Sequence, residues 1–438
     1  MNTLPSPFIH LFPEHVAPDD DQLAQQIGAP FGPMYSSGQG ANPRITAGFT
    51  YLGQFIDHDL SFDPTTSLDP RDNASPPMNF RTAAFDLDSL YGFGPNVNSY
   101  LYVPTDPRRF VVGGQYDDLP RLDNGMAVVG DPRSDENVIL SQLVTAFLNF
   151  HNEVVDREDR SFEEAQRLVR QHYQWIVLHE YLPLIVGRSL EEILKETEGH
   201  GYPDKPLIPL EFTVAAFRFG HSQVRERYDI NSNVQGKGRL VLPDLAGHKK
   251  LGPFDHVDWS FFFDLGKESQ PQPSLPIQPF ISPPMLNMPP EILGPIKSNF
   301  DVSVAYRDIR RGQLRKLPDP HDVADKMKLA KDQVVSKDLI WGKVKERLIR
   351  SGSNYDPSGK PVPMWLYILF EAQELANSEH LGPMGAQIVS AVFIGLLKAD
   401  PESILSDPGW KPTLGTDGKF SIVDLLKMAQ NQQKTATP

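Results

Sequence analysis

The stretch GQFIDHDL at residues 53–60 constrains this chain more than any other. It continues a segment that starts at Thr46, a residue type that often caps the first turn of a helix. On a helix that begins there, Gln54, Asp57 and His58 project from one face, because side chains three and four positions apart are neighbours. A lone histidine is usually structural, but an amide, a carboxylate and an imidazole are costly to bury together. We therefore expect this face to carry a functional site.

Composition indicates a large folded domain. The chain has 438 residues, of which 39% are hydrophobic and 22% charged, so a packed core is expected and wholesale disorder is not. A formal net charge of −14 disfavours nucleic acid or an anionic membrane as the main partner. The chain contains no cysteine, which excludes disulfides and thiolate chemistry.

The sequence also sets expectations for location. The N-terminal residues MNTLPSP have neither the basic region nor the apolar stretch of a signal peptide. No apolar run approaches the roughly 18 residues that a membrane-spanning helix needs. We expect a soluble protein, cytoplasmic by default, while secretion without a cleaved signal peptide stays open.

The fold is predicted to be mainly α. Pro, Gly and Asp are frequent in residues 1–45, where only a short stretch near residues 21–27 has a helical pattern, so we expect an irregular N-terminal arm. Beyond it, apolar residues recur with helical spacing. The segments expected to be helical are residues 46–59, 138–154, 161–182, 212–225, 334–350, 363–376, 383–399 and 420–428. A single large domain over residues 46–430, with long irregular loops and little β-structure, accounts for this pattern.

The segment RTAAFDLDSLYG at residues 81–92 is a candidate cation site. In an extended loop, residues two apart point the same way, so Thr82, Asp86 and Asp88 would aim oxygens at one point. Ala84 could add a carbonyl. Hard oxygen ligands at this spacing suit calcium, although acidic surface loops are common without an ion.

Two further segments carry candidate residues. GDPRSDEN at residues 130–137 places Arg133 and Glu136 at the start of a helix, where a carboxylate suits the helix dipole. Taken alone, this pair could be an ordinary helix start. AFRFGHS places His221 after Gly220, which opens space beside the imidazole.

These segments, in this order, resemble the animal-type haem peroxidases of the peroxidase–cyclooxygenase superfamily, in particular its bacterial-type members. The resemblance covers roughly residues 45–425 and implies a haem-peroxidase-like helical domain that holds haem b. It implies that His58 and Arg133 are the catalytic pair and that Gln54 lines the cavity beside them. His221 would then be the ligand of the haem iron.

The resemblance extends to residues that would hold the cofactors. Asp57 and Glu136 match carboxylates that family members often link to haem methyl groups as esters. Residues 304–318 resemble the segment that orients the proximal histidine, with Asp308 where Asn is common and Arg311 at an arginine position. The RDHG that often follows is absent. The implied calcium ligands are Asp59, Thr82, Ala84, Asp86 and Asp88.

The implied activity is that of a peroxidase, which reduces hydrogen peroxide and oxidises a small organic donor or a halide through a ferryl intermediate. Asn137 stands where the strongest halide oxidisers of the family carry Met, and Asp308 would lower the iron potential. We therefore expect phenols, iodide or bromide as donors and not chloride. Arg218 stands where cyclooxygenases and fatty-acid dioxygenases carry Tyr, which disfavours an oxygenase.

Three alternatives stay open. The pair His58-Asp59 also suggests a phosphohydrolase of the HD type, which would need further His and Asp ligands on neighbouring helices. A non-catalytic peroxidase-fold binding or adhesion protein would not need the full set of residues around His58. A haem-dependent oxygenase of a lipid or natural product is the third. A haem absorption band excludes the first alternative, and turnover with peroxide decides the second.

Overall fold

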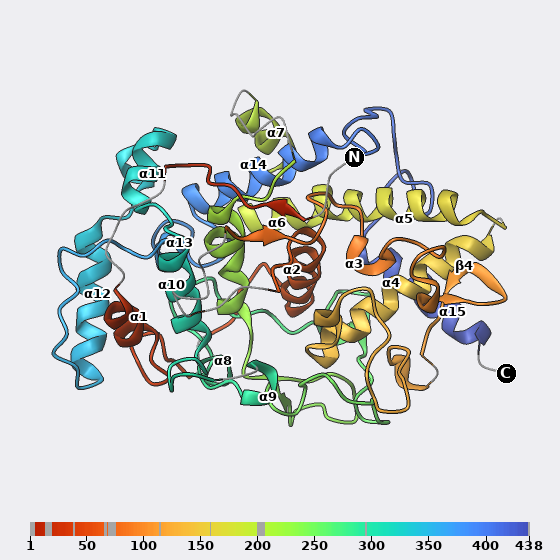
Figure 1. Ribbon diagram of the computed structural model, residues 1–438, viewed down its shortest axis with the longest axis horizontal. Helices are drawn as coiled ribbons and strands as arrows, with labels where there is room; N and C mark the ends of the chain where they lie inside the picture. The colour runs from red at the N-terminus through yellow and green to blue at the C-terminus, as the bar shows by residue number, and fades with distance from the viewer. Residues whose placement is uncertain are drawn as a thin grey trace.

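Helices form most of the regular structure in the computed structural model, which confirms the predicted fold class (Figure 1). The structure describes residues 5–13, 20–37, 40–64, 68, 76–113, 115–157, 159–198, 206–293 and 296–436. The α-helices are α1 (Asp21–Gly28), α2 (Ala47–Leu60), α3 (Asp88–Tyr91), α4 (Val138–Arg157), α5 (Phe162–Ile176), α6 (Leu182–Val186), α7 (Leu190–Thr197), α8 (Pro283–Leu286), α9 (Pro290–Leu293), α10 (Val304–Leu314), α11 (Pro320–Met327), α12 (Lys337–Arg350), α13 (Met364–Leu375), α14 (Pro383–Ala399) and α15 (Ile422–Ala436). Shorter 3-10 turns are η2 (Ser99–Leu101), η3 (Gln115–Asp117), η4 (Pro132–Asp135), η7 (Ala216–Gln223), η8 (Trp259–Phe261) and η9 (Lys331–Gln333).

Several predicted helix boundaries shift. Thr46 occupies the N-cap position of α2, but its hydroxyl donates to the carbonyl of Phe262 at 2.7 Å and does not cap the helix. The helix predicted from residue 334 begins three residues later, because the hydroxyl of Ser336 accepts from the amide of Leu339 and caps α12. The last helix extends to Ala436, past the predicted end. Residues 1–4, 14–19 and 38–39 of the predicted arm lie outside the described residues.

Two segments predicted as continuous helices are interrupted. In the 212–225 segment, the π-helical turn η6 (Glu211–Ala215) gives way to the 3-10 turn η7 at Ala215, whose φ of −132° and ψ of −72° leave the helical region. In the 161–182 segment, the π-helical turn η5 (Val177–Tyr181) separates α5 from α6. Apolar spacing cannot reveal such breaks, which often lie beside functional sites.

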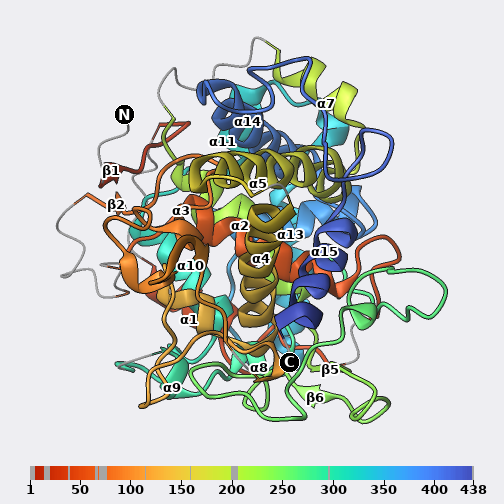
Figure 2. The ribbon, with the colours of Figure 1, turned by 90° about the vertical axis from the view of Figure 1, so that its right-hand side faces the viewer.

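Helix α2 is held by close packing. It contacts α4 and η7, and α4 in turn contacts α5 and the C-terminal helix α15, which lies along it (Figure 2). A side-chain carbon added at Gly53 would lie 2.3 Å from the hydroxyl of Tyr181, so only glycine permits this approach. The buried apolar side chains form one continuous core around these helices. The face of α2 that carries Gln54 and His58 is therefore presented by a rigid element.

Strands are short in the described residues and form three antiparallel pairs. These are β1 (Ser6–Pro7) with β2 (Met78–Asn79), β3 (Tyr102–Val103) with β4 (Asp106–Phe110), and β5 (Arg227–Tyr228) with β6 (Arg239–Leu240). The first pair ties the N-terminal segment to the rest of the chain. Fully buried Glu211 adds a second tie, because its carboxylate accepts from the amides of Leu11 at 3.0 Å and Phe12 at 3.2 Å.

Candidate active site

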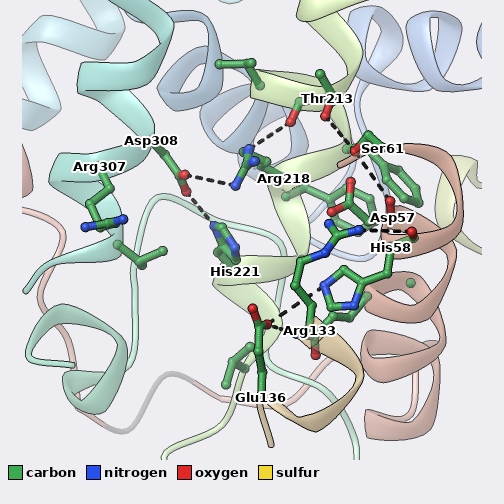
Figure 3. A pocket seen from close by; sticks show the side chains of 18 of the residues that line it. Asp57, His58, Ser61, Arg133, Glu136, Thr213, Arg218, His221, Arg307 and Asp308 are labelled. Atoms are coloured by element: carbon green, nitrogen blue, oxygen red, sulfur yellow. Dashed lines mark hydrogen bonds and ion pairs between the residues drawn. The ribbon is translucent and has the colours of Figure 1, made fainter. Parts of the chain in front are cut away.

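One cavity of about 450 Å³ brings together candidate residues from distant segments (Figure 3). Its wall is formed by α2, the junction of η4 and α4, the η6–η7 segment and α10. Every predicted catalytic and haem-binding residue lines it: Gln54, Asp57, His58, Arg133, Glu136, His221, Asp308 and Arg311. The rest of the wall is partly apolar and includes Phe217, Met285, Met288 and Leu293.

On one side of the cavity, His58 lies next to Arg133. The imidazole is only 7% exposed, and a guanidinium nitrogen of Arg133 donates to the carbonyl of His58 at 3.1 Å. Burial and, after it, the charge of Arg133 lower the pKa of His58 well below its ordinary value. The imidazole is therefore neutral at neutral pH and can accept a proton.

Gln54 and the carboxylates complete this side. Gln54 donates from Nε2 to Glu136 at 3.3 Å and accepts from the side-chain amide of Asn137 at 3.2 Å. A carboxylate oxygen of Glu136 lies 3.9 Å from Nε2 of His58, too far for a hydrogen bond. Burial raises the pKa of Glu136 to about 7, although its side chain is partly open to the cavity. Asp57 lines the same region, so both carboxylates predicted to attach a cofactor face the cavity.

Asp131 and Arg81 hold Arg133, and the sequence analysis missed both. Fully buried Asp131 accepts from the amide of Arg133 at 2.8 Å and from its Nε at 3.1 Å. Arg81 donates from Nε to the same carboxylate at 3.0 Å. Both guanidinium groups lie over the ring of Phe62, at 5.4 Å for Arg81 and 4.5 Å for Arg133. In the sequence, only their positions pointed to them: Asp131 stands two residues before Arg133, and Arg81 is the first residue of the acidic segment 81–92.

His221 on η7 faces the cavity from another side and is backed by Asp308 of α10. Nδ1 of His221 lies 2.5 Å from a carboxylate oxygen of Asp308, which is fully buried. Burial favours the neutral acid, but the charges of His221 and Arg218 outweigh it and lower the pKa of Asp308. With Nδ1 engaged, Nε2 is the nitrogen that remains for a ligand. A side-chain carbon at Gly220 would meet no atom within 4 Å, in agreement with the predicted open space beside His221.

Two arginines pair with the second oxygen of Asp308. Arg311 donates at 3.4 Å, and a guanidinium nitrogen of Arg218 lies at 3.5 Å. Burial and the neighbouring charge of Arg218 lower the pKa of Arg311 to about 9, so Arg311 stays charged at neutral pH. Arg218 also donates to the carbonyl of Thr213 at 2.8 Å. The sequence analysis noted Arg218 only as a replacement for Tyr and missed its place beside Asp308, far along the chain.

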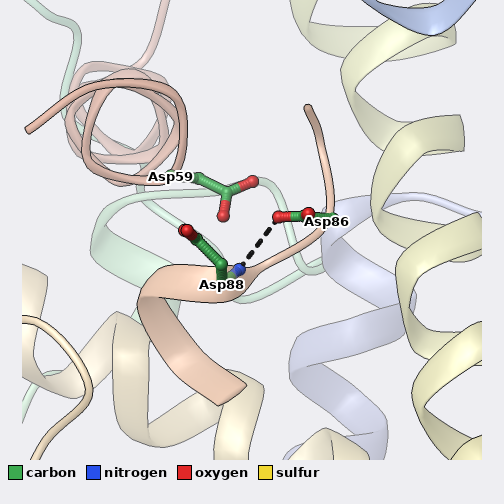
Figure 4. A group of neighbouring side chains, drawn as sticks. All are labelled: Asp59, Asp86 and Asp88. Carbon is green, nitrogen blue, oxygen red and sulfur yellow. Dashed lines mark hydrogen bonds between the residues drawn. The ribbon is translucent and has the colours of Figure 1, made fainter. Parts of the chain in front are cut away.

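The predicted alternation in the 81–92 loop is confirmed. Thr82, Ala84, Asp86 and Asp88 are half-buried, while the residues between them are buried. The loop carries Asp86 and Asp88 to Asp59 of α2, and oxygens of the three carboxylates lie within 4.8 Å of one another (Figure 4). We call Asp59, Asp86 and Asp88 the acidic cluster.

The acidic cluster has the chemistry of a cation site. Asp59 is fully buried, and one of its carboxylate oxygens and one of Asp88 have no hydrogen-bond partner among the described residues. Thr82 instead donates to both oxygens of Asp86, at 2.8 and 2.7 Å. Burial raises the pKa of all three carboxyl groups, to about 7 for Asp88. Buried carboxylates in such an arrangement cost free energy unless a cation balances them.

A family model matches part of the chain. Residues 69–250 match the family model described as animal haem peroxidase. Over these residues the chain is similar to this family. The matched residues include Arg133 and His221, whereas α2 with His58 lies before them.

Relatives of the chain include peroxidase mlt-7 of Caenorhabditis elegans, 27% identical over 203 residues, which are 41% of this chain and 28% of the relative. Lactoperoxidase of Mesocricetus auratus is 31% identical over 133 residues, 28% of this chain and 18% of the relative. The chain therefore spans less than a third of the length of these curated relatives.

Solved structures show the same fold over nearly the whole chain. Peroxidase A of Dictyostelium discoideum has a TM-score of 0.66 and 16% identity, over 91% of this chain and 88% of that chain. Fatty acid alpha-dioxygenase of Oryza sativa has a TM-score of 0.63 and 14% identity, over 98% of this chain and 79% of that chain. At these identities the likeness concerns the fold alone. Among the described residues, no helix combines the length and apolar character needed to cross a membrane.

Proposed function

We propose that this chain is a haem-dependent peroxidase that reduces hydrogen peroxide and oxidises small organic donors or a halide. The observation that carries the proposal is the pair of unlike histidines in one cavity: His58 beside Arg133, and His221 hydrogen-bonded to Asp308. The match of residues 69–250 to the animal haem peroxidase model supports it. We also propose that residues 46–430 form the peroxidase domain and that the 1–45 arm packs over it, as the β1–β2 pair and Glu211 support.

The residues present fit haem. The cavity is lined by apolar side chains, by an imidazole with Nε2 available at His221, and by the guanidinium groups of Arg307 and Arg311, which suit the carboxylates of the group. Haem supplies the redox chemistry, because no amino-acid side chain here performs it. Asp308 fixes the tautomer and direction of His221 and makes it a more basic ligand.

His58 and Arg133 divide the work on hydrogen peroxide. The neutral imidazole of His58 would take a proton from one oxygen of the peroxide and deliver it to the other, which would leave as water; haem, when bound, would supply the electrons that break the O–O bond. The guanidinium of Arg133, held by Asp131, stabilises the negative charge that develops on the departing oxygen. Gln54 positions water or a halide beside them through its contacts with Glu136 and Asn137.

Asp57 and Glu136 are proposed to attach haem covalently through esters. Both carboxylates face the cavity, and the pKa of Glu136 near 7 keeps a protonated fraction at neutral pH. After turnover with peroxide, mass spectrometry of denatured protein should show haem bound to the chain. Release of all haem on denaturation would contradict the attachment.

The acidic cluster is proposed to bind calcium, with Thr82 and the carbonyl of Ala84 as further ligands. The buried oxygens of Asp59 and Asp88 that accept no hydrogen bond from the described residues support this assignment. Because Asp59 follows His58, an ion there would also fix the direction of the imidazole. Metal analysis of active protein should find calcium, and its absence would leave the cluster a plain acidic loop.

The function is tested by assaying haem-loaded protein with hydrogen peroxide and a phenol, iodide, bromide or chloride in turn. Oxidation of the phenol, with iodide or bromide as further donors and little chloride oxidation, is the expected result. Consumption of oxygen with a fatty acid, and no oxidation with peroxide, would favour the oxygenase alternative. No turnover with any donor would favour a binding protein.

A further inference from the structure

A buried chain of charges runs from the acidic cluster toward Arg133. Nε of Arg81 lies 3.7 Å from a carboxylate oxygen of Asp88, and Arg81 also donates to Asp131 from Nε and from a terminal nitrogen, at 3.0 and 2.5 Å. Arg81 is 9% exposed and Asp131 is fully buried. Interactions between buried charges are weakly screened, so a change of charge at one end is felt at the other.

Asp131 is shared between Arg81 and Arg133. The oxygen that accepts from Arg81 also accepts from a terminal nitrogen of Arg133 at 2.8 Å, and the other oxygen accepts from Nε of Arg133 at 3.1 Å. A terminal nitrogen of Arg133 also donates to the carbonyl of His58 at 3.1 Å. The position of the guanidinium beside His58 therefore depends on where Asp131 stands.

The backbones of the two segments are also in direct contact. A side-chain carbon at Gly130 would lie 2.5 Å from the carbonyl oxygen of Ser89 in α3, so the segment that carries Asp131 rests on the acidic loop. Arg81 donates to the carbonyl of Gly130 at 3.3 Å. In a closely packed interior, a shift of the loop is passed to its neighbour.

We propose that Arg81 is a positioning residue that couples cation binding at the acidic cluster to the guanidinium of Arg133, through Asp131. The inference rests on the proposed function, because it requires haem and the cation. Without the cation, the carboxylates of the cluster draw Arg81 toward Asp88. The cation offsets the charge of these carboxylates, so that Arg81 keeps its hydrogen bonds to Asp131. Asp131 then holds Arg133 in place. If the cation strengthens the binding of a ligand that interacts with Arg133, that ligand must strengthen the binding of the cation by the same factor.

The test uses azide, a small anion that binds haem iron and senses the positive charge beside His58. In haem-loaded protein, removal of calcium with EGTA should weaken azide binding about fivefold. Saturating azide should strengthen calcium binding by the same factor. Arg81→Gln should abolish both dependences while it keeps the haem spectrum, and Arg81→Lys should restore part of them. Arg108→Gln is the matched control, because Arg108 pairs with Asp106 at 2.8 Å and Asp159 at 2.6 Å, away from the cavity.

The outcomes separate the inference from the function on which it rests. Protein that turns over peroxide but binds azide equally with and without calcium overturns the coupling alone. Arg81→Gln that keeps the coupling of the parent overturns the role of Arg81. Protein that binds no haem overturns the proposed function and the inference together. Where Arg81→Gln fails to fold, Arg81→Lys decides, because lysine keeps the charge but cannot donate to Asp131 from two nitrogens. Coupling in Arg81→Lys as strong as in the parent would contradict the role of the hydrogen bonds between Arg81 and Asp131.

Discussion

The two histidines that face the cavity differ in what holds their rings. His221 has a fully buried carboxylate on Nδ1, at 2.5 Å from Asp308, with arginines behind that carboxylate. At His58, a carboxylate oxygen of Glu136 lies 3.9 Å from Nε2, beyond hydrogen-bond distance, and the charge beside the ring is the guanidinium of Arg133. A carboxylate makes an imidazole a strong and oriented ligand, whereas burial beside a cation keeps an imidazole neutral. The same residue type is thereby suited to hold a metal on one side and to move a proton on the other.

The largest effect is expected on the proton-transfer side. His58→Ala should lower peroxide turnover by about 10²–10⁴-fold, because it removes the general base, while haem stays bound. Steady-state and stopped-flow rates with peroxide measure the loss. His248→Ala is the control, since this histidine is exposed and lies outside the cavity lining. Rates of His58→Ala within threefold of the parent would show that His58 is not the general base, and the proposed difference in role between His58 and His221 would then be wrong.

A smaller effect is expected behind His221. Asp308→Asn replaces the charged acceptor with a neutral one, so the iron potential should rise and the activity should change by about 10–100-fold. A spectroelectrochemical titration with halide assays measures both. Asp319→Asn is a matched control, because Asp319 also accepts from a histidine, His321, at 3.0 Å. A potential that does not rise in Asp308→Asn would show that this carboxylate does not control the ligand.

The smallest effect on activity is expected from a histidine of the scaffold. Nε2 of His172 accepts from the amides of Thr413 and Leu414, each at 3.2 Å. Burial lowers its pKa to about 4, below the ordinary value near 6.5. Its contribution to stability is therefore complete above pH 6.5 and is lost as the pH falls from 6.5 through 4, by about 3 kcal/mol in all.

Melting temperatures between pH 7.5 and pH 4.5 test this assignment. His172→Asn should melt lower than the parent at pH 7.5 and should lose less stability on acidification, with peroxide turnover at neutral pH nearly unchanged. Parallel pH profiles for the parent and His172→Asn would contradict the linkage. The expected result would show that burial alone does not make a histidine catalytic. The residues next to the histidine decide whether it is catalytic.

The sequence predicts most of what lies within one segment and little of what joins distant ones. Helical spacing placed Gln54, Asp57 and His58 on one wall, and period-two alternation predicted the acidic loop from Thr82 to Asp88. It could not show that Ala215 breaks the segment before His221, because apolar spacing does not separate a regular helix from a π-helical turn followed by a 3-10 turn.

The sequence also could not predict the contacts between charged residues that are far apart in the chain. Arg81 meets Asp131, and Arg218 meets Asp308, across long stretches of chain. Charge alone does not specify a partner, because the chain has 42 basic and 56 acidic residues from which many pairs could form. The tertiary packing of α2, α3 and α10 selects these pairs.

The most direct test of the account is the absorption spectrum of the protein loaded with haem, compared with that of His221→Ala. The account predicts that the parent binds haem and gives the ferric spectrum of a histidine-ligated peroxidase. His221→Ala should lose that spectrum or fail to retain haem, because no cysteine exists to replace the ligand. An unchanged spectrum in His221→Ala, or a parent that binds no haem, would contradict the central claim.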